Sequence, residues 1–323
     1  MKKILVLLFA ILLAAGISVK ASDLVIESKS QNYAETDQKI KFNGDVKVTI
    51  DDLKVVGDKA DVNVLDGAKL DTATFYDKPY AFEIKKNKKR EVKANILKVS
   101  LITKIIRAEG DTQSVVFDGK TPVVVINADV QEYNTKTGVM RATGTVTMLY
   151  KDIESYSNEA EITTDKNGDL KKLVLIGNAR VKQDNNETVA DKLVYDATTE
   201  NVTATGRTTS TVYTDDGTKM VLKSGMQEYN QKRGVFNASN NVRIWYDDYY
   251  AAGPKVSLYP GPNGKPNEAN FIGRSSITQG VRTIYADRIK MTMKPKTFDA
   301  KGNTRTVIKN IGSNTDENVT LGL

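Results

Sequence analysis

Residues 131–152 read QEYNTKTGVMRATGTVTMLYKD, and residues 227–248 read QEYNQKRGVFNASNNVRIWYDD. Eleven of the 22 aligned positions are identical, and the two stretches lie 96 residues apart without a gap. Self-similarity at a fixed offset is typical of chains that are built from stacked structural units. The repeat, more than any single motif, therefore decides the fold of this chain.

The duplication belongs to a finer repeat that is centred on Gly144. Equivalents of this glycine, each flanked by alternating apolar residues, follow one another at spacings of 29–34 residues. We call these nine places the reference positions: Gly44, Asp77, Gly110, Gly144, Gly177, Gly206, Asn240, Gly273 and Gly302. A period near 33 residues predicts nine repeated units, and three units separate the two quoted stretches.

Apolar or small residues alternate with polar ones on both sides of each reference position. Around Gly144, the residues at even offsets are Met140, Ala142, Val146 and Met148. Such alternation predicts β-strands with one face directed inward, and we expect the reference glycine on that face, where a missing side chain permits a bend. The chain shows no sustained helical period after its first residues. The sequence therefore predicts an all-β protein of about nine repeated two-strand units.

An alanine followed by an acid recurs about 13 to 18 residues after five of the reference positions, as in Ala190-Asp191. We expect this pair to open the second strand of its unit. Small residues share the inward columns with large ones, which leaves two interpretations of the interior. It is either an ordinary packed core or a space left partly open for an apolar ligand.

The first residues, MKKILVLLFAILLAAGISVKASD, have the layout of a secretory signal peptide. Two lysines precede the apolar run, and Val19-Lys20-Ala21 offers a cleavage site. The alternative, a membrane anchor, is disfavoured because fourteen apolar residues fall short of the ~20 that span a bilayer. We expect a signal peptide over 1–21, repeats over 22–312 and a tail over 313–323.

The composition disfavours catalysis and nucleic-acid binding. The chain has no histidine and no cysteine, so the usual general base, thiol nucleophile and metal ligands are missing. We expect no enzyme activity, no cofactor and no metal. Its 47 basic residues include three in the leader, which leaves 44 against 40 acidic residues, or +4. This charge is too small to indicate a nucleic-acid partner.

One basic run, KKNKKR at residues 85–90, is the densest charge in the chain. It is either a solvated turn between strands or a place that attracts lipid phosphates or an anionic membrane surface.

The repeated phrase resembles the OstA-like family of lipopolysaccharide transport, which includes LptA-like periplasmic bridge proteins. The first half of the phrase runs from Tyr133 through Gly138 and Gly144 to Met148, and ADKLVY at 190–195 supplies the second half. The unit from Tyr33 to Val48 looks like the amino-terminal strand pair of that family. The likeness extends over nearly the whole chain after residue 21, with one short motif in each unit.

The resemblance implies an elongated, V-shaped β-jellyroll that is open along one side. Its apolar interior would hold the acyl chains of the lipid A part of lipopolysaccharide. The edge strands, here Leu24 to Ser28 and Arg305 to Ile311, would pair with LptC-like and LptD-like jellyrolls or with further copies of the chain. The protein would then be periplasmic and would bridge the inner and outer membranes. The chain has about twice the usual number of units, so it is either one long jellyroll or two fused ones.

On this interpretation, the inward positions contact lipid. The candidate lining residues are Phe42, Val46, Val48, Met140, Val146, Met148, Leu173, Leu175, Val181, Phe236, Val242, Ile244, Phe271, Ile277 and Phe298. The main alternative is a secreted β-repeat structural or adhesin protein with a filled core. The two hypotheses differ in whether the interior has room.

Overall fold

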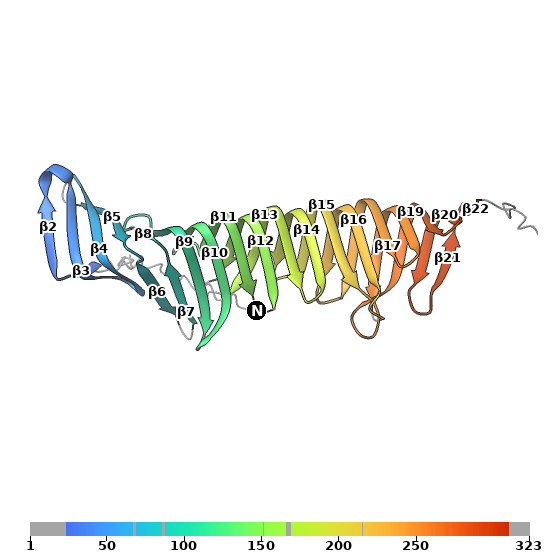
Figure 1. Cartoon of the computed structure of the whole chain (residues 1–323), viewed down its shortest axis with the longest axis horizontal. Coiled ribbons are helices and arrows are strands. Elements are labelled where there is room, and N and C mark those ends of the chain that lie inside the picture. The colour runs from blue at the N-terminus through green and yellow to red at the C-terminus, as the bar shows by residue number, and fades with distance from the viewer. Residues whose placement is uncertain are drawn as a thin grey trace, which may run out of the picture.

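The computed structural model describes residues 24–66, 69–85, 88–150, 152–165, 169–214 and 216–309. The expected signal peptide and carboxyl-terminal tail lie outside these residues. The described chain forms an elongated stack of antiparallel strands, with β2 near one end and β22 at the other (Figure 1). No helix in the described ranges is long and apolar enough to cross a membrane.

The strands follow one another along the chain with few other elements between them. They are β1 (Leu24–Glu27), β2 (Ser30–Ala34), β3 (Lys39–Ile50), β4 (Leu53–Leu65), β5 (Lys69–Tyr76), β6 (Tyr80–Lys85), β7 (Lys88–Lys93), β8 (Ile96–Ser100), β9 (Ile105–Asp118), β10 (Thr121–Asn134), β11 (Val139–Tyr150), β12 (Ile153–Thr164), β13 (Leu170–Gln183), β14 (Asn186–Asp196), β15 (Asn201–Tyr213), β16 (Lys219–Asn230), β17 (Val235–Tyr246), β18 (Tyr249–Pro260), β19 (Pro266–Gln279), β20 (Arg282–Thr292), β21 (Thr297–Lys301) and β22 (Arg305–Ile308). A single 3₁₀ turn, η1 (Glu35–Asp37), precedes β3.

Pairing joins nearly every strand to its neighbours in the sequence. At four places two short strands lie end to end along one long partner: β1 and β2 on β3, β5 and β6 on β4, β7 and β8 on β9, and β21 and β22 on β20. Counting each such pair as one strand reduces 22 strands to 18, which is two strands for each of nine units. The prediction of an elongated all-β fold is confirmed.

Every second strand bends at its reference position. All nine reference residues have a positive φ, from 65° at Asp77 to 100° at Gly144. The strand ladder is also irregular at these places: Thr143 and Val146 on β11 face Glu159 and Ser157 on β12, so β11 contains one extra residue. A glycine in the left-handed region that carries an extra residue is the geometry of a β-bulge. We call this bent place in each strand the corner.

Two local predictions were wrong. Gly144 does not face inward but is exposed, and a side chain added to it would meet the exposed carboxylate of Asp129 on the neighbouring strand. The alanine–acid pairs do not open strands either, since Ala190 and Asp191 lie in the middle of β14. Both differences have one cause: β11 and β14 run through the corner without ending, and the acid stands beside the glycine where the strand turns.

The corner predicts a measurable cost of side chains at Gly144. Alanine there would place Cβ 2.1 Å from Oδ2 of Asp129 and 2.6 Å from its Cβ, at a φ of 100°. We expect Gly144→Ala to destabilise the protein by about 2–4 kcal/mol, from backbone strain and overpacking together. Urea denaturation followed by circular dichroism measures the shift in midpoint.

Gly217 supplies the matched control. Its φ is 81°, but nothing lies within 4 Å of an added Cβ. Gly217→Ala should therefore carry only the backbone term, about 1–2 kcal/mol. Equal shifts for the two variants would show that the close approach at the corner does not matter.

Buried side chains form three clusters along the axis. The amino-terminal cluster lies on β3–β9 and includes Phe42 and Phe75. The middle cluster lies on β10–β15 and includes Met148 and Leu175. The carboxyl-terminal cluster lies on β16–β20 and includes Phe271. The interior is thus apolar from end to end, but it is not equally filled.

Candidate functional site

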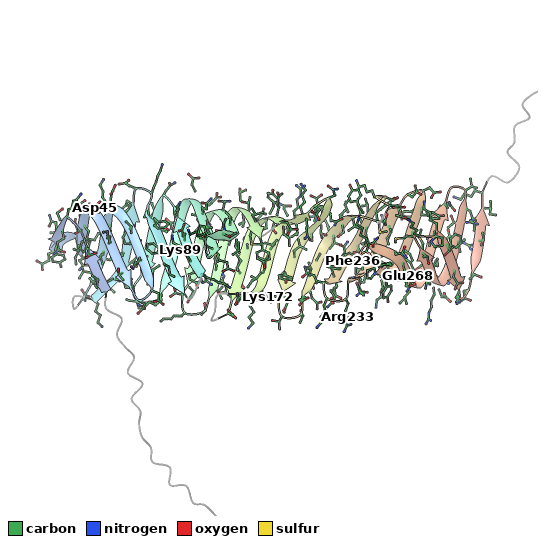
Figure 2. The ribbon with its side chains drawn as sticks, turned by 90° about the horizontal axis from the view of Figure 1, so that it is seen from below. Asp45, Lys89, Lys172, Arg233, Phe236 and Glu268 are labelled. Carbon is green, nitrogen blue, oxygen red and sulfur yellow. The ribbon has the colours of Figure 1, made fainter. Side chains whose placement is uncertain are left out.

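A cavity of about 950 Å³ lies in the middle of the stack. Its walls come mainly from β6 to β18, with Leu53 of β4 and Pro266 of β19 at the limits, and the middle cluster lies at its centre. At ~4.8 Å between neighbouring strands, this part of the stack is about 50 Å long. Figure 2 labels Phe236, which lines the cavity, and Lys89, whose neighbours Lys88 and Arg90 line it nearer the amino-terminal end. The volume is at the upper end of the range for ligand sites in proteins.

The corner carries small residues in most of the central units. Two residues before the reference position stand Phe42 and Phe75 at the amino-terminal end and Phe271 near the other end. In between, the same column holds alanine at four of five positions, for example Ala108 and Ala204, which both line the cavity. Phenylalanine fills this place at the two ends. Alanine alone does not open the interior, because Ala238 in the same column lies in the packed carboxyl-terminal cluster.

All fifteen predicted lining residues are buried or half-buried, but the structure divides them into groups. Six line the cavity: Met140, Met148, Leu173, Leu175, Val181 and Phe236. Eight lie in packed interior outside its lining: Phe42, Val46 and Val48 in the amino-terminal cluster, Val146 in the middle cluster, and Val242, Ile244, Phe271 and Ile277 in the carboxyl-terminal cluster. The last, Phe298, lies below the guanidinium of Arg282, 5.1 Å from the ring centroid.

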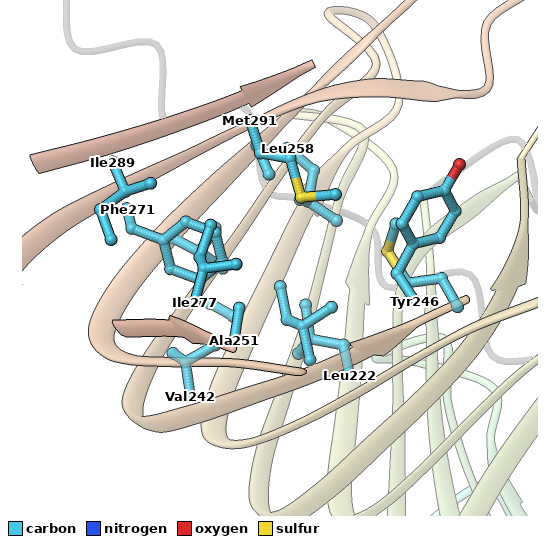
Figure 3. Packing of buried hydrophobic residues seen from close by; sticks show 14 of the residues in the cluster. Leu222, Val242, Tyr246, Ala251, Leu258, Phe271, Ile277, Ile289 and Met291 are labelled. Carbon is cyan, nitrogen blue, oxygen red and sulfur yellow. The ribbon is translucent and has the colours of Figure 1, made fainter. Parts of the chain in front are cut away.

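The carboxyl-terminal cluster closes the cavity at that end. Met220, Met291, Met293 and Tyr246 fill the interior there and leave a residual space of only about 10 Å³. The hydroxyl group of Tyr246 points away from Phe271 and Ile277 (Figure 3) and makes no hydrogen bond within the described chain. Burial raises the pKa of Tyr246 above its usual value. The two hypotheses about the interior are therefore each correct for part of the chain: the ends are packed and the middle is open.

Two glutamines brace the floor of the cavity. Gln131 is 3% exposed, and its Oε1 accepts a hydrogen bond of 2.5 Å from the hydroxyl of Ser114. Its Nε2 donates to the carbonyl oxygens of Thr112 and Ile126, which flank the bend. Ser114 pairs with Ile126 on one side of the corner, whereas Gln131 pairs with Ala108 on the other. The side-chain bond therefore joins the two halves of a sharply bent strand pair.

The same hydrogen-bonded serine–glutamine pair, which we call the brace, occurs 96 residues later. Gln227 is 2% exposed and accepts a 2.5 Å hydrogen bond from Ser210, while its Nε2 donates to the carbonyl of Leu222. All four residues of the two braces line the cavity. Sequence analysis missed them because they are polar, although each glutamine is the first residue of a quoted repeat, QEYN. A polar residue kept at an inward position was the available signal.

The brace predicts a loss of stability when Gln131 is replaced by leucine. Gln131→Leu leaves the Ser114 hydroxyl and two carbonyl groups without their partner in an apolar interior. We expect destabilisation by about 1–3 kcal/mol in urea denaturation. The double variant Ser114→Ala with Gln131→Leu should recover part of that loss, because the serine hydroxyl is then gone. A double variant no more stable than the single one would contradict the brace.

The turns between strands form two rows that border the cavity. Because successive strands are antiparallel, the turn after β9 and the turn after β11 lie in one row, and those after β10 and β12 lie in the other. Cavity residues come from both rows, for example Tyr150 and Asp152 from the first and Thr135 and Asp169 from the second. We call the space between the rows the mouth. An apolar floor with a polar mouth suits a molecule that has apolar chains and a polar head.

The basic run lies at the amino-terminal end of the mouth. Lys89 forms an ion pair with Glu91 and lies over the ring of Tyr80, and hydrogen bonds with Glu91 and Tyr80 raise the pKa of Lys89. Burial opposes ionisation of Glu91, but the hydrogen bonds from Lys89 and Tyr80 outweigh it and lower the pKa of Glu91. The run is therefore partly paired and is more than a solvated turn.

Within the described ranges, no group of three or more Asp, Glu, His or Cys side chains is arranged to hold a metal ion. Carboxylates at the mouth instead pair with lysine and arginine or bind turn amides, as in the bond from the Asp169 amide to the Asp165 carboxylate. The arrangement can sequester apolar chains from water, and its chemistry is that of binding.

A comparison with protein families matches residues 25–122 to the family described as LptA/(LptD N-terminal domain) LPS transport protein. The resemblance to that family is confirmed. The matched OstA-like segment runs from β1 to the beginning of β10, so it contains the packed amino-terminal cluster and the basic run. The strands that follow continue the same alternation and corners without a break in pairing.

Among solved structures, the chain is similar to LptH of Pseudomonas aeruginosa, described as the LptA homologous periplasmic component of the conserved lipopolysaccharide transport device. The identity is 11%, the TM-score is 0.31, and the match covers 35% of this chain and 76% of LptH. No curated protein matches the chain.

Proposed function

We propose that this OstA-like protein is a non-enzymatic periplasmic carrier that holds lipopolysaccharide by the acyl chains of its lipid A and helps move it from the inner to the outer membrane. The observation that carries the proposal is the open middle of the stack. A filled interior along the whole chain would favour the alternative, a secreted structural or adhesin repeat. A cavity of about 950 Å³ with an apolar floor and a polar mouth favours the carrier.

The energy of acyl chains in water supports this role. Each exposed CH₂ group costs ~0.8 kcal/mol, so a chain of about a dozen costs on the order of 10 kcal/mol. Leu173, Leu175 and Met148 offer an apolar wall that removes this cost. Because the repeat provides similar walls in successive units, a chain can shift along the cavity without a large change in free energy.

The edge strands supply the surfaces for assembly. β1 pairs with β3 on one side only, and β22 pairs with β20 on one side only within the described chain. Val25 on β1 and Ile308 on β22 are each about half exposed, 50% and 49%. Unpaired edges of this kind bind further strands by β-augmentation. The partners would be LptC-like and LptD-like jellyrolls or further copies of the chain.

Filling the cavity tests the proposal. Val181 lines the cavity, and the neighbouring Lys182 is exposed. We expect Val181→Trp to reduce the lipopolysaccharide that copurifies from a diderm host by about tenfold, because overpacking an occupied site costs ~1–3 kcal/mol. Native mass spectrometry or a lipid A assay measures the retained lipid.

Lys182→Trp is the matched control and should retain as much lipid as the parent protein. Equal loss in both variants, or none in either, would contradict binding in the cavity. An absence of lipid from the parent protein itself would favour the structural-repeat alternative.

A further inference from the structure

The hairpin of β6 and β7 is the most strongly basic element of the chain. Residues 80–93 contain six basic and two acidic side chains, a balance of +4. The whole chain after residue 21 has the same net balance of +4, so the rest of it is neutral in sum. A local excess of positive charge attracts anions to this place more than to any other unit.

This hairpin crosses the mouth of the cavity. Lys88, the first residue of β7, faces Asp118 in strand register and so belongs to the first row of turns. Its ammonium group nevertheless forms an ion pair with Asp169, which precedes β13 in the second row. Both residues line the cavity. The contact joins residues 81 positions apart and connects the two rows of turns across the mouth.

Arg90 makes a second contact across the interior. Its Nη1 donates a 2.6 Å hydrogen bond to the hydroxyl of Tyr133, and the guanidinium lies 5.5 Å from the centroid of that ring. Arg90 and Tyr133 also line the cavity. The two cationic groups of Lys88 and Arg90 therefore stand where the polar head of an amphiphile would lie if its chains occupied the cavity.

The ion pair to Asp169 can be exchanged. The side chains of Lys88 and Asp169 are 29% and 58% exposed, and an ion pair in contact with water adds little net stability. A phosphate group offers several oxyanion acceptors, and an arginine binds two of them at once. Glu83, Glu91, Asp118 and Asp169 also line the cavity near the hairpin, so a bound phosphate competes with these carboxylates for Lys88 and Arg90.

We propose that the β6–β7 hairpin is a binding site for the anionic head group of the lipid whose chains fill the cavity. In this site a phosphate group replaces Asp169 as the partner of Lys88 and also binds Arg90. The exchange releases the contact across the mouth, so the arrival of the head group opens the way for the chains. The inference rests on the proposed function and adds a site for a phosphorylated amphiphile.

Binding of two matched lipids to the full chain tests this site. The probes are phosphorylated lipid A and the same lipid A after enzymatic removal of its phosphates, both in detergent at 150 mM salt. We expect the parent protein to bind the phosphorylated form about tenfold more tightly, as charge-assisted hydrogen bonds predict. Lys88→Gln with Arg90→Gln should reduce that preference to about twofold or less. Asp169→Asn should strengthen binding of the phosphorylated lipid about threefold, because it removes the competitor.

Lys98→Gln is the matched control, since Lys98 pairs with Glu109 and does not line the cavity. It should leave the preference unchanged. Equal binding of both lipids by the parent protein, or a preference that survives in the Lys88/Arg90 variant, would overturn the site. Displacement of lipid by millimolar inorganic phosphate alone would assign the site to a free oxyanion and overturn the head-group proposal. Failure of both lipids to bind would instead overturn the proposed function.

Discussion

The fold depends on one constraint, which is the left-handed backbone at the corner of every second strand. Glycine adopts positive φ without a steric penalty, and seven of the nine reference positions are glycine. The other two, Asp77 and Asn240, are residue types that tolerate this region best. The bend folds each strand onto itself, so one continuous sheet encloses an interior. Without it, the same alternating strands would form a flat sheet with an uncovered apolar face.

Side-chain size at the corner differs along the stack. Phe42, Phe75 and Phe271 fill the two ends, and alanine stands at most of the corners between them. The buried glutamines donate hydrogen bonds to backbone carbonyl groups near the bend in the open segment. The same repeat therefore makes a packed wall in one unit and a binding space in the next.

The sequence predicted the architecture well because both of its signals are local. Strand alternation and the spacing of glycine depend only on neighbouring residues, and the nine repeated units agreed in register. The orientation of Gly144 was not predictable from alternation, since the bulge turns residues 143–145 outward while Ala142 and Val146 on either side stay buried. Which predicted lining residues meet the cavity and which lie in packed interior could not be predicted from the sequence either. Ile244 and Met148 occupy the same column, but whether each meets a cavity depends on residues from other strands, such as Met220 and Met291 beside Ile244. The crossing from Lys88 to Asp169 joins residues 81 positions apart, which no local pattern records.

The account is tested most directly by photo-crosslinking in living diderm cells. A photoreactive residue is placed at Leu173 in the cavity, at the exposed Lys172 beside it and at Phe271 in the packed cluster. The account predicts lipopolysaccharide adducts at position 173 and none at 172 or 271. Adducts of equal strength at 172 and 173, or none at 173 in folded protein, would contradict a lipid path through the open middle of the stack.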